Sequence, residues 1–296
     1  MGKELAKAYP TARAVFAEVD DALGQPLSAL MWEGPEDQLT LTENAQPALM
    51  AVSLAALRTL CEEKGFVLED RVAYVAGHSL GEYSALAAAD SLSLADTARL
   101  LKTRGRAMQA AVPVGQGAMA ALLGAEVAEA QALAEAASEG EVCAVANDNA
   151  PGQVVISGTR AAIERAVALG PKFGARRAVL LPVSAPFHCA LMQPAATIMA
   201  EALGQVSIAA PAVPLIANVL ASAISDPETI RNSLIEQVTG KVRWRESMLY
   251  LREQGVETLY EVGAGRVLTG LARRFDGFEA RSIGTPEELE AAAAAL

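Results

Sequence analysis

Apolar residues along the 296-residue chain follow two different spacings, which alternate from one end of the chain to the other. Near the N-terminus they recur at every third or fourth position: Leu5, Tyr9, Ala12, Phe16, Val19 and Leu23. This spacing predicts a helix over 2–23, and Gly24 is a typical helix end. Short continuous apolar runs, such as 72–76, predict strands instead. The alternation of helices and strands is typical of an α/β fold.

The same two patterns predict the other elements of the chain. Helices are expected over 44–62, 81–89, 94–111, 126–139, 160–169, 189–203, 227–238, 244–254 and 265–275. Strands are expected over 117–123, 142–147, 154–157, 177–183, 213–219 and 257–262. Thr285 is a typical N-cap and Pro286 a typical first helical residue, so the Ala-rich C-terminal stretch is expected to form a short helix.

The middle of the chain has its own order of elements. Between residues 114 and 183 the expected order is βαββαβ, with a turn at Asn149-Ala150-Pro151-Gly152 between the two central strands. This order is typical of a split, ferredoxin-like unit. We therefore expect a ferredoxin-like subdomain over 114–183, inserted into a larger domain formed by 1–113 and 184–296.

Composition narrows the class of protein. The chain is 52% hydrophobic but only 4% aromatic, so its core must consist mainly of Ala, Leu and Val, which suits helices packed on a parallel sheet. The formal net charge of −11 argues against nucleic acid or an anionic membrane as a partner, because binding phosphates needs a basic surface.

The cysteines and the N-terminus indicate the compartment. Cys61, Cys143 and Cys189 are widely spaced and form no CxxC pair, which favours a reducing compartment and argues against a zinc site. The first residues form a charged, helix-like stretch that lacks the features of a signal peptide. No window approaches the ~18 uninterrupted apolar residues of a membrane span. We therefore expect a cytoplasmic protein without a metal.

A candidate nucleophile lies between a strand and a helix. Ser79 is the centre of the run Gly77-His78-Ser79-Leu80-Gly81, here called the Ser79 turn, which separates the strand 72–76 from the helix 81–89. In a G-x-S-x-G turn of this kind the serine hydroxyl is exposed at the edge of the sheet. The N–H of Leu80, at the start of the helix, then faces the oxyanion that develops during acyl transfer.

The base of this serine follows by elimination, because the chain has two histidines. The His78 side chain diverges from that of its neighbour Ser79 on a tight turn, which leaves His188. Serine before histidine is the chain order of α/β-hydrolase-type sites. Asp96 and Asp148 are possible third members of a triad, although neither lies in a signature. A main-chain carbonyl can orient the imidazole equally well, and we prefer that option.

Arg104 is the third informative residue. In the expected helix 94–111 it shares the apolar face of Leu101 and Met108. An arginine on such a face needs an anion. A structural ion pair with Asp or Glu would provide one, and so would the carboxylate of a substrate held by a bidentate clamp.

Several motifs together resemble those of malonyl-CoA:acyl carrier protein transacylases, and the likeness extends over nearly the whole chain. The motifs nearest the candidate residues are Gly77-His78-Ser79-Leu80-Gly81-Glu82-Tyr83-Ser84-Ala85, Arg104-Gly105 with Met108-Gln109, and Phe187-His188. The others are Gln46-Pro47-Ala48-Leu49, Asn149-Ala150-Pro151-Gly152-Gln153, Val242-Arg243-Trp244, and Glu261-Val262-Gly263-Ala264-Gly265 with Val267-Leu268.

The resemblance implies a role for each matching residue. Ser79 would take malonyl from malonyl-CoA and pass it to the phosphopantetheine thiol of acyl carrier protein, with His188 as the base. Arg104 would hold the malonyl carboxylate, and the main-chain carbonyl of Arg243 would orient His188. The bulk of Phe187 would crowd an α-methyl branch and so favour malonyl.

The resemblance also implies the partners and the fold. Leu80, Gln46 and Asn149 lie in matching motifs and join the expected substrate-binding residues. The expected fold is an α/β-hydrolase-like domain that carries a ferredoxin-like subdomain. The expected protein is a monomer that uses a coenzyme A thioester as substrate and needs no cofactor.

The chain departs from the family pattern at its start. The family opens with a strand and a Gly-Gln-Gly-Ser-Gln loop, whose second Gln supplies the other oxyanion N–H. This chain begins Met1-Gly2-Lys3-Glu4-Leu5, which is similar to the helix after that loop. We therefore expect one strand and one oxyanion donor to be absent, and losing one such donor costs roughly 2.7–4 kcal/mol of transition-state stabilisation.

Two alternatives to the transferase remain open. One is a serine hydrolase or thioesterase that uses the same Ser79 and His188, and Arg104 argues against a hydrolase of simple esters. The other is a catalytically impaired chain that binds carrier protein. For the acidic carrier protein, candidate docking residues are the pairs Arg176-Arg177 and Arg273-Arg274. The pathway, fatty-acid or polyketide, is left open.

Overall fold

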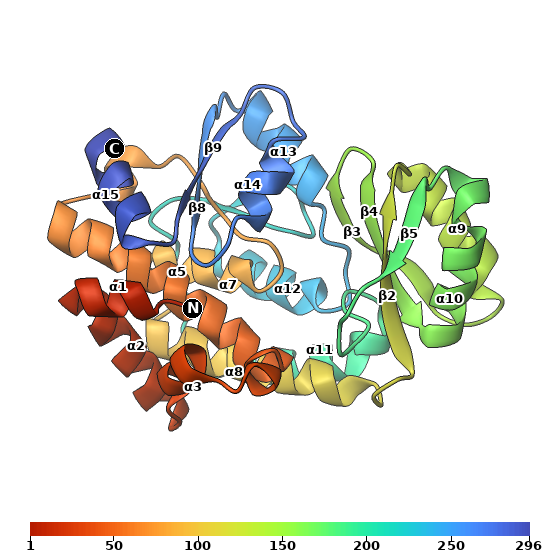
Figure 1. The fold of residues 1–296 in the computed structure, drawn as a ribbon, viewed down its shortest axis with the longest axis horizontal. Helices are drawn as coiled ribbons and strands as arrows, with labels where there is room; N and C mark the ends of the chain where they lie inside the picture. The colour runs from red at the N-terminus through yellow and green to blue at the C-terminus, as the bar shows by residue number, and fades with distance from the viewer.

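The computed structural model describes residues 1–296 and is a mixed α/β structure with three separate sheets (Figure 1). In the first sheet β1 (Val75–Ala76) pairs parallel with β6 (Leu215–Ile216), which pairs antiparallel with β7 (Ala223–Ile224). In the second, β8 (Thr258–Val262) and β9 (Glu279–Ile283) are parallel. The third sheet has four strands and lies at the other end of the molecule.

Helices surround the first two sheets. Before β1 lie α1 (Lys3–Ala8), α2 (Pro10–Leu23), α3 (Leu27–Glu33), α4 (Glu36–Leu39), α5 (Thr42–Lys64) and α6 (Leu68–Arg71). After β1 come α7 (Gly81–Ala88), α8 (Leu94–Ala111), α11 (Gln193–Gly204), α12 (Pro227–Gln237), α13 (Trp244–Glu253), α14 (Val267–Ala272) and α15 (Pro286–Ala295). None of these helices has the length and apolar character to cross a membrane.

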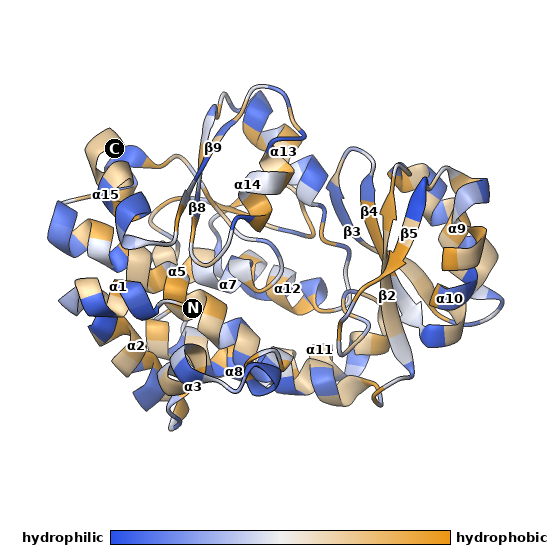
Figure 2. Cartoon of the chain, in the orientation of Figure 1, coloured by the Kyte–Doolittle hydropathy of each residue, from blue (hydrophilic) through white to orange (hydrophobic).

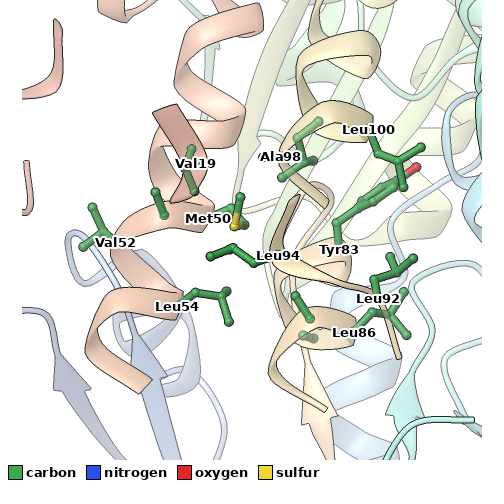
Figure 3. Packing of buried hydrophobic residues seen from close by; sticks show 14 of the residues in the cluster. Val19, Met50, Val52, Leu54, Tyr83, Leu86, Leu92, Leu94, Ala98 and Leu100 are labelled. Atoms are coloured by element: carbon green, nitrogen blue, oxygen red, sulfur yellow. The ribbon is translucent and has the colours of Figure 1, made fainter. Parts of the chain in front are cut away.

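The largest core lies where α2, α5 and α8 pack together. Figure 3 shows Val19, Met50 and Leu94 from this region side by side. Small residues let the helices approach closely: a Cβ added to Gly105 of α8 would lie 2.5 Å from the Cα atom of Glu43 in α5. The expectation of a core rich in Ala, Leu and Val is confirmed, since these types make up most of this cluster.

The third sheet has a core of its own. It contains β2 (Gly117–Leu123), β3 (Cys143–Ala150), β4 (Gln153–Thr159) and β5 (Arg177–Leu180), all antiparallel, in the order β3-β4-β2-β5. Along the chain α9 (Val127–Ser138) separates β2 from β3, and α10 (Arg160–Leu169) with the 3₁₀ turn Gly170–Phe173 separates β4 from β5. The order of elements is therefore βαββαβ, as expected over this stretch.

The edge strand β3 lies toward the rest of the molecule, and Figure 2 shows a hydrophilic stretch in it. Its C-terminal half contains Asn147, Asp148 and Asn149. Asn147 forms a parallel bridge with Val242, and the main-chain N–H of Asp148 donates to the carbonyl of Val242. This strand therefore connects the four-stranded sheet to the segment before α13.

Several boundaries differ from the sequence prediction for physical reasons. The helix expected over 2–23 is two helices, because Pro10 begins α2 and lacks the N–H that a continuous helix would use. The predicted end at Gly24 is confirmed, with φ 60°. The strands expected over 72–76 and 213–219 shrink to the two-residue β1 and β6. The helix expected over 189–203 starts as a 3₁₀ turn, Ala190–Met192, before Pro194 in the first turn of α11.

Candidate active site

The Ser79 turn joins β1 to α7 in a strained conformation. Ser79 has φ 54°, in the left-handed region that residues with a side chain rarely adopt. The turn is tight because Gly77 approaches the start of the helix: a Cβ on Gly77 would lie 1.9 Å from the carbonyl oxygen of Gly81. The glycine leaves room for this approach, and the serine side chain is presented away from the backbone of the turn.

His188 lies against the candidate nucleophile. Its Nε2 is 2.8 Å from Ser79 Oγ. Its Nδ1 faces two main-chain carbonyls, at 2.9 Å from the Gln237 oxygen and 3.2 Å from the Gly240 oxygen. Because a carbonyl can only accept, Nδ1 carries the proton, and Nε2 has a free lone pair facing the serine hydroxyl.

The surroundings of His188 keep it neutral. Burial and the nearby Arg104 cation lower the pKa of His188 to about 3, against an ordinary value of 6.5. Hydrogen bonds to the two carbonyls act in the opposite direction but are the weaker influence. The imidazole is therefore able to accept a proton at neutral pH.

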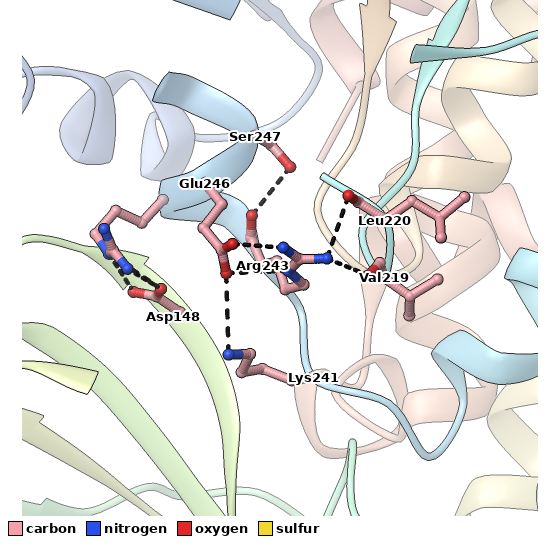
Figure 4. Close-up of polar contacts among 8 residues, drawn as sticks. Asp148, Val219, Leu220, Lys241, Arg243, Glu246 and Ser247 are labelled. Atoms are coloured by element: carbon pink, nitrogen blue, oxygen red, sulfur yellow. Dashed lines mark hydrogen bonds and ion pairs between the residues drawn. The ribbon is translucent and has the colours of Figure 1, made fainter. Parts of the chain in front are cut away.

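The expectation that the Arg243 carbonyl orients His188 is wrong. That carbonyl accepts instead from the N–H and the hydroxyl of Ser247. The physical reason is that α13 begins at Trp244, so the Arg243 oxygen accepts the first hydrogen bond of the helix. Figure 4 shows the Arg243 side chain engaged with Glu246 and with the carbonyls of Val219 and Leu220.

Neither carboxylate considered as a third triad member contacts His188. Asp96 accepts from Ser93 at the start of α8 and pairs with Arg99. Asp148 is fully buried and forms a two-oxygen contact with Arg245 at 2.9 and 3.0 Å (Figure 4). The imidazole is oriented by main-chain carbonyls alone.

The Arg104 guanidinium reaches the same serine from α8. The side chain is 1% exposed. Its Nη1 donates to Gln46 Oε1 at 2.8 Å, and its Nη2 donates to Gln237 Oε1 at 2.8 Å and to Ser79 Oγ at 3.1 Å. All three partners are uncharged. Burial lowers the pKa of Arg104, but a guanidinium stays protonated at neutral pH.

A cavity of about 510 Å³ opens beside these side chains. Ser79 and Arg104 line it together with three other residues of the sequence prediction, Gln46, Leu80 and Phe187. The main-chain N–H of Leu80 donates no hydrogen bond within the chain. An N–H without a partner at a helix start is a suitable donor for a developing oxyanion.

Asn149, which the resemblance placed among the substrate-binding residues, is not among the residues that line this cavity. Asn149 lies on the edge strand β3 of the four-stranded sheet, and its Oδ1 is 2.8 Å from Nε2 of His78. The His78 ring also packs against Trp244, with ring centroids 5.5 Å apart. Asn149 and His78 therefore connect the Ser79 turn to the neighbouring sheet, and the His78 imidazole makes no hydrogen bond to Ser79.

Two side chains that the sequence analysis missed hold the Ser79 turn. Asn218 Oδ1 accepts from the Ser79 N–H at 2.7 Å, and Asn218 Nδ2 donates to the Gly77 carbonyl at 2.7 Å. Gln237 Nε2 donates to the Ser79 carbonyl at 3.0 Å. The only available signal was their position, with Asn218 near the end of the expected strand 213–219 and Gln237 near the end of the expected helix 227–238, and neither belongs to a motif.

The remaining candidates are surface residues. Arg176, Arg177, Arg273 and Arg274 are all exposed. Of these, Arg274 donates to the Pro151 carbonyl at 3.3 Å. No three or more His, Cys, Asp or Glu side chains gather as a metal site would need.

Comparisons with known proteins agree on one family. Residues 1–281 match the acyl transferase domain. The malonyl CoA-acyl carrier protein transacylase of Escherichia coli strain K12 is 44% identical over 290 residues, 98% of this chain and 93% of its own length. The crystal structure of the acyl-carrier-protein-S-malonyltransferase from Bartonella henselae is 56% identical, with a TM-score of 0.97 over 100% of this chain and 94% of that chain.

A further similar structure contains a partner. It is a malonyl-transacylase in complex with the type II polyketide synthase acyl-carrier protein AntF, 40% identical, with a TM-score of 0.96 over 100% of this chain and 95% of that chain. The family match and the identities cover nearly the whole chain. From its sequence and its fold alike, the chain belongs to the acyl transferase family.

Proposed function

We propose that the protein transfers a malonyl group from malonyl-CoA to the phosphopantetheine thiol of acyl carrier protein through a malonyl-Ser79 intermediate. The relatives that support this are a malonyl CoA-acyl carrier protein transacylase and an acyl-carrier-protein-S-malonyltransferase. The observation that carries the proposal is the Arg104 guanidinium, buried beside Ser79 with uncharged partners only. A buried cation whose hydrogen-bond partners are all uncharged favours the binding of an anion beside it.

In the first half-reaction, His188 Nε2 accepts the proton of the Ser79 hydroxyl as Oγ attacks the thioester carbon. The Leu80 N–H stabilises the oxyanion. When the intermediate collapses, the carbon–sulfur bond breaks, and the coenzyme A sulfur takes the proton from His188. Arg104 pairs with the free malonyl carboxylate throughout.

In the second half-reaction, the carrier thiol gives its proton to His188 Nε2 and attacks the carbonyl carbon of malonyl-Ser79. The ester bond to Oγ breaks, and the serine recovers its proton from His188. A malonyl carboxylate held by Arg104 fixes the ester relative to the entering thiol, which favours transfer over hydrolysis.

Gln46 and Phe187 have supporting roles in this proposal. Gln46 accepts from Arg104 and thereby aims the guanidinium at the space beside Ser79. Phe187 directly precedes the base His188 in the sequence and lines the same cavity. Its ring would leave little room there for a branched acyl group. Leu80 supplies its N–H to the oxyanion, as above.

The fold description that we propose has two parts. Residues 1–113 and 184–296 form an α/β-hydrolase-like catalytic domain, and 114–183 form a ferredoxin-like subdomain. The order β3-β4-β2-β5 and the separate core of the four-stranded sheet support the second part. The strand–turn–helix arrangement at Ser79 supports the first.

Mass spectrometry of the intact protein tests this function. Incubation with malonyl-CoA should add one malonyl group to the protein, and digestion should locate it on Ser79. When holo acyl carrier protein is then added, the malonyl group should move from Ser79 to the carrier protein. Ser79→Ala should gain nothing. Malonylation of Ser79→Ala would contradict the proposal.

The same assay separates the two alternatives. A hydrolase would release free malonate at the same rate with and without carrier protein. A catalytically impaired chain would bind carrier protein but leave Ser79 unmodified.

A further inference from the structure

A second acidic group lies behind the Ser79 turn and has no part in the mechanism above. Glu82 is the second residue of α7, and its side chain is entirely buried. No Lys, Arg or His side chain forms an ion pair or a hydrogen bond with it, and its Oε1 has no hydrogen-bond partner. Burying a carboxylate in this way is costly, so its presence needs an explanation.

The contacts of Glu82 lead to both residues that hold the Ser79 turn, the side chain of Gln237 and the main chain of Asn218. Its Oε2 accepts a short hydrogen bond from Gln237 Nε2 and a longer one, 3.4 Å, from the main-chain N–H of Asn218. The Glu82 N–H itself donates to the Ser79 carbonyl at 3.1 Å. One carboxylate thus contacts the two residues that bind the backbone of Ser79 from either side.

Gln237 is the more informative of the two contacts, because its side-chain amide can be oriented in two ways. In the observed orientation its NH₂ group faces Glu82 and the Ser79 carbonyl, and its Oε1 faces the Arg104 guanidinium. A flipped amide would place an oxygen against two acceptors and an NH₂ group against a cation. Glu82, together with the Ser79 carbonyl and the Arg104 guanidinium, therefore stabilises the orientation that holds Arg104 beside Ser79.

The surroundings of Glu82 act on its charge in opposite directions. Burial raises the pKa of Glu82 to about 7, while the hydrogen bonds from Gln237 and Asn218 and the Arg104 cation lower it. The other titratable group coupled to Glu82 is Tyr83, on the same helix. The start of α7 also favours a negative charge at this position.

We propose that Glu82 is a positioning residue of the acyl-transfer site, which locks the Gln237 amide and Asn218 and so fixes Ser79, His188 and Arg104 relative to one another. Gln237 connects to all three: its side chain binds Ser79 and Arg104, and its main-chain carbonyl accepts from His188. The proposal rests on the function proposed above, but it concerns the reactivity of the serine itself.

A neutral serine reagent tests this role apart from malonyl transfer. The rate at which phenylmethylsulfonyl fluoride modifies Ser79, followed by intact-protein mass, reports the Ser79–His188 pair without needing Arg104 to hold a carboxylate. The amide of Glu82→Gln can donate as well as accept, so the variant removes one of the three contacts that select the orientation of Gln237. We expect it to slow modification by about 100-fold, the cost of a small misplacement of reacting groups.

A matched control separates positioning from stability. Thr59 is a fully buried polar residue of α5 whose hydroxyl donates to the Ala55 carbonyl at 2.7 Å, away from the Ser79 turn. Thr59→Val should lower the melting temperature and leave the modification rate of the folded protein unchanged. If Glu82→Gln behaves like Thr59→Val, the positioning role is wrong.

A second variant covers the case in which Glu82→Gln does not fold. Gln237→Leu removes the amide that Glu82 orients and keeps the main-chain carbonyl that accepts from His188. It should slow modification of Ser79 to a similar extent, and an unchanged rate would overturn the proposal. Failure of the proposed function is seen separately, as wild-type protein that reacts with the reagent at Ser79 but takes no malonyl group.

Discussion

Arg104 and Arg245 differ in the groups that accept their hydrogen bonds. Arg245, at the junction with the four-stranded sheet, meets the fully buried carboxylate of Asp148 through two oxygens (Figure 4). Arg104 is more deeply buried, yet its partners are two amide oxygens and a hydroxyl. Arg245 and Asp148 are in direct contact and are called the balanced pair below. Arg104 contacts no carboxylate, although Glu82 lies near enough to influence its pKa, and its surroundings are called the unbalanced site. The first arrangement is that of a structural contact, and the second is that of a site for an anion.

The largest expected effect concerns the base at the unbalanced site. His188→Ala should slow acylation of Ser79 by malonyl-CoA about 1000-fold, because general-base catalysis contributes 10²–10⁴-fold. Quenched-flow measurement of malonyl-protein formation gives this rate. His78→Ala is the matched control, since His78 bonds to Asn149 and faces away from the hydroxyl. Equal losses in the two variants would show that His188 has no special role.

The balanced pair should affect stability and leave selectivity intact. Arg245→Ala leaves the Asp148 carboxylate buried without its partner, which should lower the free energy of unfolding by about 3 kcal/mol. Urea denaturation followed by circular dichroism measures this loss. The ratio of malonyl to acetyl transfer should stay at the wild-type value, and a changed ratio would remove the distinction between the two arginines.

The unbalanced arginine should show the reverse behaviour. Arg104→Ala removes the partner of the malonyl carboxylate and should reduce the preference for malonyl-CoA over acetyl-CoA about 30-fold, a typical value for a lost charge-assisted hydrogen bond. The ratio of kcat/KM for the two thioesters measures it. A preference equal to that of the wild type would mean that the carboxylate binds elsewhere.

The pH dependence gives a finer test of the same site. This test uses Glu82→Gln, because Glu82 itself, with a pKa of about 7, would titrate in the same range. With the pKa of His188 lowered to about 3, modification of Ser79 in this variant by a neutral reagent should fall less than about 2-fold between pH 7.5 and pH 5.0. An unperturbed histidine would be largely protonated at pH 5.0 and would lose about 30-fold. The Arg104 cation is the second cause of the lowered pKa, so Arg104→Ala should move the acid limb to higher pH.

The lowered pKa of His188 also determines how the stability of the protein depends on pH. Because the folded-state pKa of His188 lies below 6.5, the folded protein binds fewer protons there than the unfolded chain. Stability from this residue is therefore complete above pH 6.5 and is lost as the pH falls toward 3.

The two regions also differ in how well the sequence predicts them. The helix expected over 94–111 and the strand expected over 117–123 have the observed bounds, because their patterns depend on neighbours along the chain. The four-stranded sheet, built of nearby antiparallel strands, has the expected order of elements. The strand expected over 72–76 is only two residues long, since its pairing depends on β6, more than 130 residues away.

The same reason explains what was missed at the site. Ser79, His188 and Arg104 could be proposed from a motif, an elimination and a helical face. Gln237 lies 158 residues from Ser79 in the chain and carries no motif, so only the fold shows its contact. The error at Arg243 has the same origin: which carbonyl faces His188 depends on the path of the chain between α12 and α13.

The most direct test of the contrast between Arg104 and Arg245 is a crystal structure of Ser79→Ala with malonyl-CoA bound. We expect the malonyl carboxylate to accept hydrogen bonds from the Arg104 guanidinium, with Arg245 still paired to Asp148. A carboxylate that points to solvent, with Arg104 still bound only to Gln46 and Gln237, would contradict it.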